Sequence, residues 1–345
     1  MAPADSYLRR LHQTTNTHWW HDSADPLELR RGLDHGAVGV TTNPYLAALA
    51  LARNREAWKP QIQEVLAARL DPEAKAEHLM HLVVGRAAAQ LKPEYERSEG
   101  QNGWVCAQVN PHRASDREGM RAMARRFAQW APNITVKLPA TSAGLEVLEE
   151  CAAEGISITA TVSFTVPQLV AIAERYRRGR QRARTGGITA RPCFAVIMIG
   201  RLDDYLREVA QDQCAAVTEL DIRQAGLAVT KRAYATYLQQ GYEATLLVAA
   251  LRGTYHLTEL AGANLVMSIA PAWQEPLLSP DLICEKRIHH EVPADVIRRL
   301  LALSEFVRAY EPDGMAPPEF VTYGVTQRTL AQFSESGWKK LESFR

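Results

Sequence analysis

The stretch Asn133-Ile-Thr-Val-Lys-Leu-Pro-Ala-Thr-Ser-Ala-Gly-Leu145 contains a strand, a turn and the start of a helix. Ile134 to Leu138 is apolar and rich in β-branched residues, which predicts a short buried strand. Pro139 ends that strand, and Thr141-Ser142 supplies a hydroxyl that can cap the helix that follows. This order of strand, polar turn and helix is the unit from which parallel sheets are built.

Lys137 is the one charged residue in this apolar strand. Burying an ammonium costs several kcal/mol unless the group loses its proton, so a buried lysine has a lowered pKa. A neutral amine can attack a ketone to form a Schiff base. The structural alternative is a lysine at a strand end whose head group reaches solvent. The strand alone does not decide between these two interpretations.

The same alternation of strand and helix runs through most of the chain. Eight short apolar segments separated by helical segments predict a parallel sheet, and eight is the number that closes a (β/α)8 barrel. An open, doubly wound sheet is the competing arrangement, but no glycine-rich phosphate loop follows any expected strand. The expected strands cover residues 18–22, 37–40, 103–109, 134–138, 155–162, 193–198, 245–250 and 264–269.

Composition narrows the class of protein. The 345 residues carry 40 basic and 39 acidic side chains, so no general affinity for nucleic acid is expected. No apolar run approaches the roughly 18 residues of a membrane span, and the N-terminus has no hydrophobic signal core. The five cysteines are widely spaced without a CxxC pair, which indicates reduced thiols and a cytoplasmic protein. The histidines lack ligand spacing, so no metal site is expected.

Polar side chains fall where the expected strands end. In a (β/α)8 barrel these carboxyl ends meet on one face, and catalytic groups gather there. We therefore expect one site built from Asp22, Asn43, Gln108, Lys137, Thr161, Arg201 and Arg252.

Four motifs together resemble the transaldolase family. They are Thr41-Thr-Asn-Pro44, Ile134-Thr-Val-Lys-Leu-Pro-Ala-Thr141, Gly200-Arg201, and Leu260-Ala-Gly262 with Ser268-Ile-Ala-Pro271. The similarity runs in order from about Trp20 to Pro271. It implies a (β/α)8 Schiff-base enzyme that uses no metal or organic cofactor and moves a dihydroxyacetone unit between sugar phosphates.

The resemblance gives each matching residue a role. Lys137 corresponds to the Schiff-base nucleophile and Asp22 to the aspartate that handles the proton at the breaking carbon–carbon bond. Thr161, with Gln108, would hold the catalytic water. Asp25 is a rival to Asp22, but its place before Pro26 predicts a helix cap instead.

Three further residues would bind the substrate. Asn43 would orient a substrate hydroxyl through its amide, although a role in the turn before Pro44 is the alternative. Arg201 and Arg252 would bind the phosphate, because a planar guanidinium matches phosphate oxygens two at a time.

The departures from the family pattern concern proton transfer and sugar contacts. Gln108 stands where transaldolases have a glutamate, and an amide cannot take a proton. The related fructose-6-phosphate aldolases also have glutamine there, with a helper tyrosine that is Met198 in this chain. Several polar contacts to the sugar are replaced by Val196, Thr159 and Ala250. A changed substrate, a slower enzyme or a different carbon–carbon reaction would each account for these changes.

The resemblance leads us to expect a transaldolase-like transferase acting on small sugar phosphates. An aldolase that cleaves without transfer is the first alternative, and a barrel that binds sugar phosphates without turnover is the second. We expect one barrel domain over residues 1–345, with residues 271–345 forming a mostly helical C-terminal extension. A homodimer is the assembly considered, although the sequence does not decide the oligomeric state.

Two further charged segments are interpreted from their position relative to the expected strands. Seven arginines lie between Arg175 and Arg191. They are expected in a solvated loop on the barrel face opposite the chemistry. The acidic segment from Leu202 to Leu227 follows the sixth strand on the catalytic face, where it could form a lid, a subunit contact or an ordinary acidic helix surface.

Overall fold

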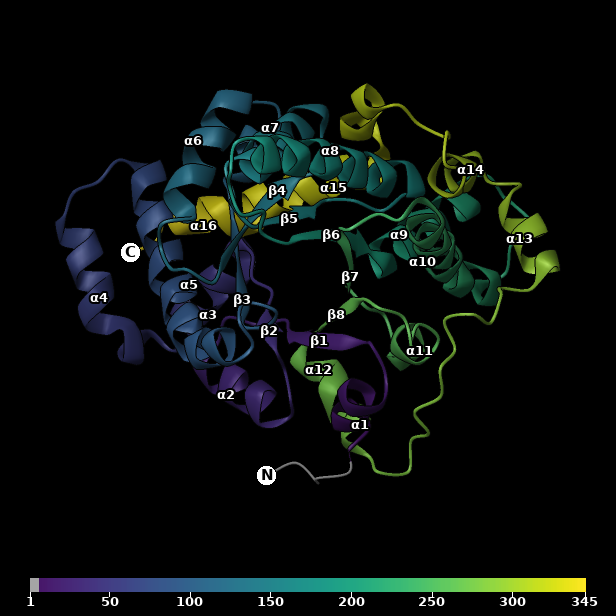
Figure 1. The fold of residues 1–345 in the computed structure, drawn as a ribbon, viewed down its shortest axis with the longest axis horizontal. Coiled ribbons are helices and arrows are strands. Elements are labelled where there is room, and N and C mark those ends of the chain that lie inside the picture. The colour runs from purple at the N-terminus through teal and green to yellow at the C-terminus, as the bar shows by residue number, and fades with distance from the viewer. Residues whose placement is uncertain (1–5) are drawn as a thin grey trace.

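The computed structural model describes residues 6–345 and contains a closed barrel of eight parallel strands (Figure 1). Each strand pairs with the next along the chain, and β8 closes the barrel by pairing with β1. The expected (β/α)8 fold is therefore confirmed, and the open doubly wound sheet is excluded. The strands are β1 (His18–His21), β2 (Gly39–Val40), β3 (Trp104–Gln108), β4 (Ile134–Pro139), β5 (Ile158–Thr161), β6 (Cys193–Met198), β7 (Thr245–Ala249) and β8 (Val266–Ile269).

Helices surround the barrel and follow most of its strands. The longer α-helices are α1 (Tyr7–Thr14), α2 (Pro26–Asp34), α3 (Pro44–Arg53), α4 (Arg55–Ala67), α5 (Pro72–Arg97), α6 (Arg117–Phe127), α7 (Ser142–Ala153), α8 (Val166–Thr185), α9 (Ile199–Asp212), α10 (Glu219–Gln240) and α15 (Gly324–Phe333). Shorter helical segments are α11 (Thr254–Thr258), α12 (Pro271–Gln274), α13 (Ala294–Leu300), α14 (Ser304–Tyr310), α16 (Lys339–Glu342), η1 (Pro111–Arg113), η2 (Glu275–Leu278), η3 (Pro317–Thr322) and η4 (Ser334–Trp338). Between residues 6 and 345, no helix is both long enough and apolar enough to cross a membrane.

Side-chain caps fix where the helices after the catalytic strands begin. Thr141 Oγ1 accepts a hydrogen bond from Gly144 N at 3.1 Å, so α7 starts immediately after the turn that ends β4. Asp25 Oδ1 accepts hydrogen bonds from Leu27 N and Glu28 N at the start of α2. The cap role expected for Asp25 is thus confirmed.

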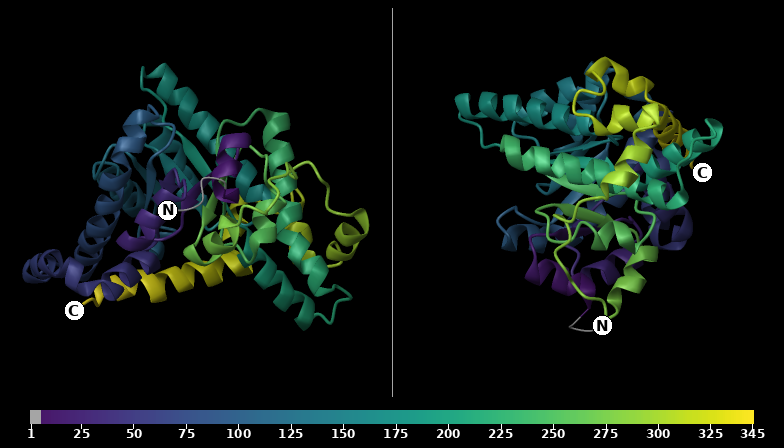
Figure 2. Two further views of the ribbon diagram at one scale, coloured as in Figure 1. Left: turned by 90° about the horizontal axis from the view of Figure 1, so that it is seen from below. Right: turned by 90° about the vertical axis from the view of Figure 1, so that its right-hand side faces the viewer.

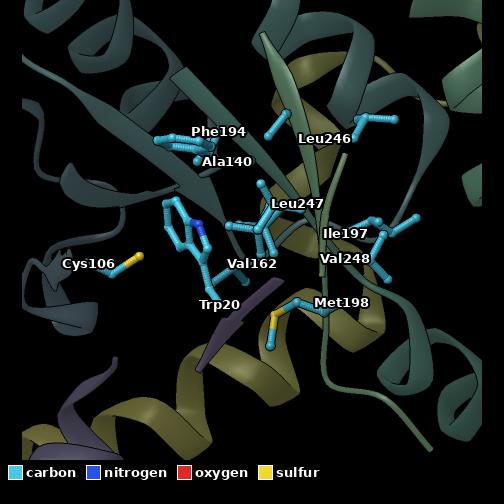
Figure 3. Packing of buried hydrophobic residues seen from close by; sticks show 14 of the residues in the cluster. Trp20, Cys106, Ala140, Val162, Phe194, Ile197, Met198, Leu246, Leu247 and Val248 are labelled. Atoms are coloured by element: carbon cyan, nitrogen blue, oxygen red, sulfur yellow. The ribbon is translucent and has the colours of Figure 1, made fainter. Parts of the chain in front are cut away.

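Aromatic rings fill the barrel interior below the catalytic end. Trp20 and Phe194 lie edge to face with ring centroids 4.6 Å apart, and both are almost fully buried (Figure 3). Gly39 permits this arrangement, because a Cβ at that position would lie 2.5 Å from the Trp20 indole. The packed interior forms a floor beneath the polar groups at the strand ends.

The arginine-rich segment is mostly helical, so the expectation of a loop was wrong. Helix α8 continues to Thr185, and its arginines pair with acidic residues: Arg175 and Arg182 both contact Glu149. Gly179 lies inside this helix, and a Cβ there would lie 2.5 Å from Ala152 Cβ in α7. The glycine therefore serves close helix packing. The segment does precede β6, on the face opposite the strand ends, as expected.

The C-terminal elements return across the catalytic side of the barrel. In the left view of Figure 2, α15, η4 and α16 form a long yellow rod whose end lies beside the early helices. Helix α15 contacts α9, and α16 contacts α5 and α3. The division into a barrel and a C-terminal extension stays a prediction, but these contacts bring the end of the chain to the mouth of the barrel.

Candidate active site

A cavity of about 280 Å³ lies at the carboxyl ends of the strands. Five of the seven residues expected at the site line it. Thr41 and Ser268, which the sequence analysis quoted only as parts of motifs, also line it. The polar lining residues are Asp22, Thr41, Asn43, Lys137, Arg201, Arg252 and Ser268.

Lys137 is buried at the base of this cavity, with 7% of its surface exposed. Its Nζ donates a hydrogen bond to the Thr42 carbonyl oxygen at 3.1 Å. Burial lowers the pKa of Lys137 below its ordinary value of 10.5, and the charge of Arg201 acts in the same direction, whereas Asp22 opposes it. The side chain therefore does not snorkel into solvent, and the fraction of neutral amine is raised.

Asp22 directly follows β1 and lines the same cavity as Lys137. Its Oδ1 accepts a hydrogen bond from Thr41 Oγ1 at 2.9 Å, and the Thr41 hydroxyl also contacts Ser268 Oγ. Burial raises the pKa of Asp22, while the charge of Lys137 and the two hydroxyl contacts lower it. A carboxyl whose pKa is raised toward the working range can accept and return a proton.

Gln108 and Thr161 lie beside Lys137 on the neighbouring strands but do not line the cavity. Gln108 pairs in register with Lys137, and Thr161 pairs with Pro139. Gln108 Oε1 and Thr161 Oγ1 are buried and have no hydrogen-bond partner. Unpaired buried polar atoms are uncommon and call for a specific explanation, such as a position that binds water or substrate.

Asn43 has a structural role and also faces the cavity. Its Oδ1 accepts a hydrogen bond from Leu46 N at 2.9 Å, which caps α3. The two interpretations of this residue are therefore compatible, because the cap uses the amide oxygen and holds the side chain at the cavity wall.

Arg201 and Arg252 lie together at the mouth of the cavity, where the chain leaves β6 and β7. Arg201 is in the first turn of α9, and its buried Nε has no partner. Burial and the charge of Arg252 both lower the pKa of Arg201, which indicates that the two guanidinium groups repel each other. Arg252 donates to Asp204 Oδ2 from Nε at 2.9 Å and from Nη2 at 2.7 Å. Two cations with one carboxylate form a site of net positive charge, which suits an anion.

The close approach of the two arginine-bearing segments depends on Gly200. A Cβ at this position would lie 2.4 Å from the Ala250 carbonyl oxygen and 2.5 Å from Arg252 Cγ. Gly200 N instead donates to Ala250 O at 3.2 Å, so the two segments are joined through the backbone.

The C-terminal helix α15 contributes residues that sequence reasoning missed. Gln332 Oε1 accepts a hydrogen bond from Arg201 Nη1 at 2.6 Å, and Phe333 lines the cavity with the Arg201 guanidinium 5.3 Å from its ring centroid. Trp273, which follows β8, also lines the cavity. No local pattern marks Gln332 or Phe333, because they reach the site only through tertiary packing.

Among residues 6–345, no group of three or more His, Cys, Asp or Glu side chains is placed to hold a metal ion. All five cysteines are free, and Cys106, Cys151 and Cys193 are buried.

Comparison with known proteins places this geometry in a family. The profile of the family described as Transaldolase/Fructose-6-phosphate aldolase matches residues 19–336. A transaldolase of Mycobacterium tuberculosis (strain H37Rv) is 32% identical over 207 residues, covering 58% of this chain and 54% of that protein. A transaldolase of Thermobifida fusca (strain YX) is 29% identical over 234 residues, covering 63% of this chain and 62% of that protein.

The chain thus spans about half the length of the M. tuberculosis relative that it matches. The family match extends further, from the first barrel strand to η4 near the C-terminus. Since that match covers most of the chain and the barrel carries the lysine, aspartate and paired arginines at one end, the chain belongs to the transaldolase/fructose-6-phosphate aldolase family.

Proposed function

We propose that the protein transfers a dihydroxyacetone unit from a ketose phosphate to an aldehyde through a Schiff base on Lys137. The observation that carries the proposal is the placement of Lys137 Nζ. It is buried in a cavity shared with one carboxyl group and two guanidinium groups. A site for phosphate binding alone would not need a buried amine.

In the first half of the reaction, the neutral Lys137 amine attacks the ketone carbon of the substrate, and loss of water gives an iminium ion. Asp22 then takes the proton of the hydroxyl on the carbon that becomes the aldehyde carbon when the bond breaks. The bond cleaves, an aldehyde phosphate leaves, and the electron pair remains on the three-carbon unit, where the iminium ion stabilises it.

In the second half, the bound carbanion adds to the carbonyl carbon of an acceptor aldehyde. Asp22 returns its proton to the new alkoxide. Water, held by Gln108 and Thr161, hydrolyses the iminium ion and restores Lys137. Their unpaired buried atoms, Gln108 Oε1 and Thr161 Oγ1, support this placement of the water. Asn43 orients a hydroxyl of the three-carbon unit, and Arg201 with Arg252 binds the phosphate.

The alternative function is aldol cleavage without transfer, as in fructose-6-phosphate aldolases. Protonation of the carbanion and hydrolysis would then release dihydroxyacetone. Gln108 favours this alternative by its identity, since those aldolases also carry glutamine there. Met198, which lines the cavity where they have a helper tyrosine, weighs against it because a thioether cannot deliver a proton.

Product analysis distinguishes the two functions. The protein is incubated with fructose 6-phosphate, with and without erythrose 4-phosphate, and the products are separated by chromatography. Transfer predicts a seven-carbon ketose phosphate and glyceraldehyde 3-phosphate only when the acceptor is present. Release of dihydroxyacetone at the same rate in both reactions would establish aldol cleavage, and no conversion of any ketose phosphate would refute both functions.

A further inference from the structure

The catalytic cavity has a polar side and an apolar side. The polar groups near Lys137 come from strand ends at β8, β1 and β2, where Ser268, Asp22 and Thr41 follow one another around the barrel. The neighbouring sector, formed by β6 and β7 next to β8, presents only apolar strand side chains to the cavity.

Four residues define this apolar wall: Val196 and Met198 on β6, and Leu247 and Ala249 on β7. They form two pairs in register, Val196 with Leu247 and Met198 with Ala249, and all four line the cavity. Figure 3 shows Met198 and Leu247 on the opposite side of these strands from Ile197 and Val248. The wall is therefore a continuous patch on the inner face of two adjacent strands.

The position of the wall determines which part of a substrate meets it. Arg201 follows β6 and Arg252 follows β7, so the anion-binding pair stands at the upper end of these two strands. A substrate that reaches from Lys137 to the arginines passes over the apolar wall. The atoms concerned are those between the reacting carbonyl carbon and the phosphate, which belong to the aldehyde partner.

The backbone of the wall offers few free groups to a hydroxyl in this region. Val196 O accepts a hydrogen bond from Ser163 Oγ, and Met198 N donates to Ser163 O at 3.0 Å. Ala250 O, just above the wall, accepts from Gly200 N and from Arg252 Nη1.

Neither polar side chain of β5, Thr159 or Thr161, lines the cavity. Thr159 Oγ1 hydrogen bonds to Thr135 Oγ1 at 2.9 Å and lies 3.6 Å from Cys106 Sγ. Gln108 and Thr161 lie on the strands beside Lys137 and do not line the cavity.

We infer that the aldehyde partner of this enzyme is a phosphorylated aldehyde with few or no hydroxyl groups between its carbonyl carbon and its phosphate. A hydroxyl buried against an apolar wall loses its hydrogen bonds to water without replacement, whereas a methylene group gains favourable burial. The inference rests on the proposed Schiff-base function and adds the class of aldehyde to it.

The test compares two acceptors of equal length, erythrose 4-phosphate and 4-oxobutyl phosphate, which lacks both internal hydroxyls. With fructose 6-phosphate as donor, kcat/KM is measured for each acceptor. We expect it to be at least about 10-fold higher for 4-oxobutyl phosphate, since an apolar pocket discriminates against an added hydroxyl by roughly 10- to 100-fold. Equal values, or a preference for erythrose 4-phosphate, would overturn the inference.

Two variants test whether the apolar wall causes the preference for 4-oxobutyl phosphate. Val196→Thr keeps the shape of the side chain and adds a hydroxyl, so the ratio of the two kcat/KM values should fall about 10-fold toward erythrose 4-phosphate. Ile197→Val changes the same strand on its outer face and should leave the ratio unchanged. An unchanged ratio in Val196→Thr, with circular dichroism confirming its fold, would contradict the inference.

Borohydride reduction with the donor alone separates this inference from the proposed function. A Lys137 adduct together with the opposite acceptor preference refutes only the apolar-aldehyde inference. Absence of the adduct refutes the Schiff-base function on which the inference rests.

Discussion

Replacement of Arg252 with alanine should weaken the binding of phosphorylated substrates by more than the loss of one phosphate contact. A charge-assisted hydrogen bond contributes about 1.5–3 kcal/mol, which corresponds to roughly a 10- to 100-fold increase in KM. The variant also removes one of two guanidinium groups that Asp204 contacts: Arg252 donates to its Oδ2 at 2.9 and 2.7 Å, while Arg207 donates to its Oδ1 at 2.9 Å. Because the Arg252 and Asp204 side chains are 38% and 40% exposed, solvent screens the repulsion between Asp204 and the phosphate to about 1 kcal/mol, or roughly 5-fold.

A double-mutant cycle separates these two contributions. Asp204→Asn combined with Arg252→Ala removes the repulsion and should recover the factor of about 5. KM is measured for fructose 6-phosphate and for unphosphorylated fructose, which should be almost insensitive to either change. Equal losses for both sugars would refute the assignment of Arg252 to phosphate. If the KM of the double variant for fructose 6-phosphate were no lower than that of Arg252→Ala, the repulsion assigned to Asp204 would be refuted.

Three other perturbations test separate parts of the account. Gln108→Glu should raise turnover with fructose 6-phosphate and erythrose 4-phosphate by at least about 10-fold, because it supplies a group that accepts protons. Unchanged turnover with intact donor binding would show that another step limits the rate. The rate of Schiff-base formation should rise with pH through a midpoint below 10.5, since burial lowers the pKa of Lys137 and only the neutral amine reacts. A midpoint at or above 10.5 in stopped-flow trapping would contradict the lowered pKa. Gly200→Ala should lower the free energy of unfolding in urea by roughly 1–3 kcal/mol, because its Cβ would lie 2.4 Å from Ala250 O. Gly85→Ala on the surface of α5 is the control, since its Cβ meets only the flexible His81 side chain. Equal effects of the two changes would show that the backbone junction at Gly200 tolerates a side chain.

The barrel was predictable because its signal is local and repeated. Each apolar segment ends in a turn residue or a cap that can be recognised in the sequence, as at Pro139 and Thr141, and the structure has a strand at every expected place. The bounds were less accurate: β2 contains only Gly39–Val40, and β5 begins at Ile158. The residue at which a strand ends depends on how far the neighbouring strands continue beside it, and the local sequence does not contain this information.

The site was predictable where a polar residue lies at the end of an expected strand, and it was missed where tertiary packing supplies the residue. Lys137, Asp22 and the two arginines gather in one cavity as expected. Gln332 reaches Arg201 from a helix 131 residues later in the chain, and nothing in its neighbourhood indicates this contact. The helical course of the arginine-rich segment was missed for the same reason, since the packing of Gly179 against Ala152 is a tertiary contact.

The central claim is that Lys137 forms the covalent intermediate, and borohydride reduction in the presence of fructose 6-phosphate tests it most directly. Peptide mass spectrometry should locate the reduced adduct on Lys137, and Lys137→Met should abolish it. Lys231→Met is the matched control, because burial also lowers the pKa of Lys231, which lines a separate cavity. This variant should form the adduct as the unmodified protein does. An adduct on Lys231 or another lysine, or no adduct with any ketose phosphate, would contradict the account.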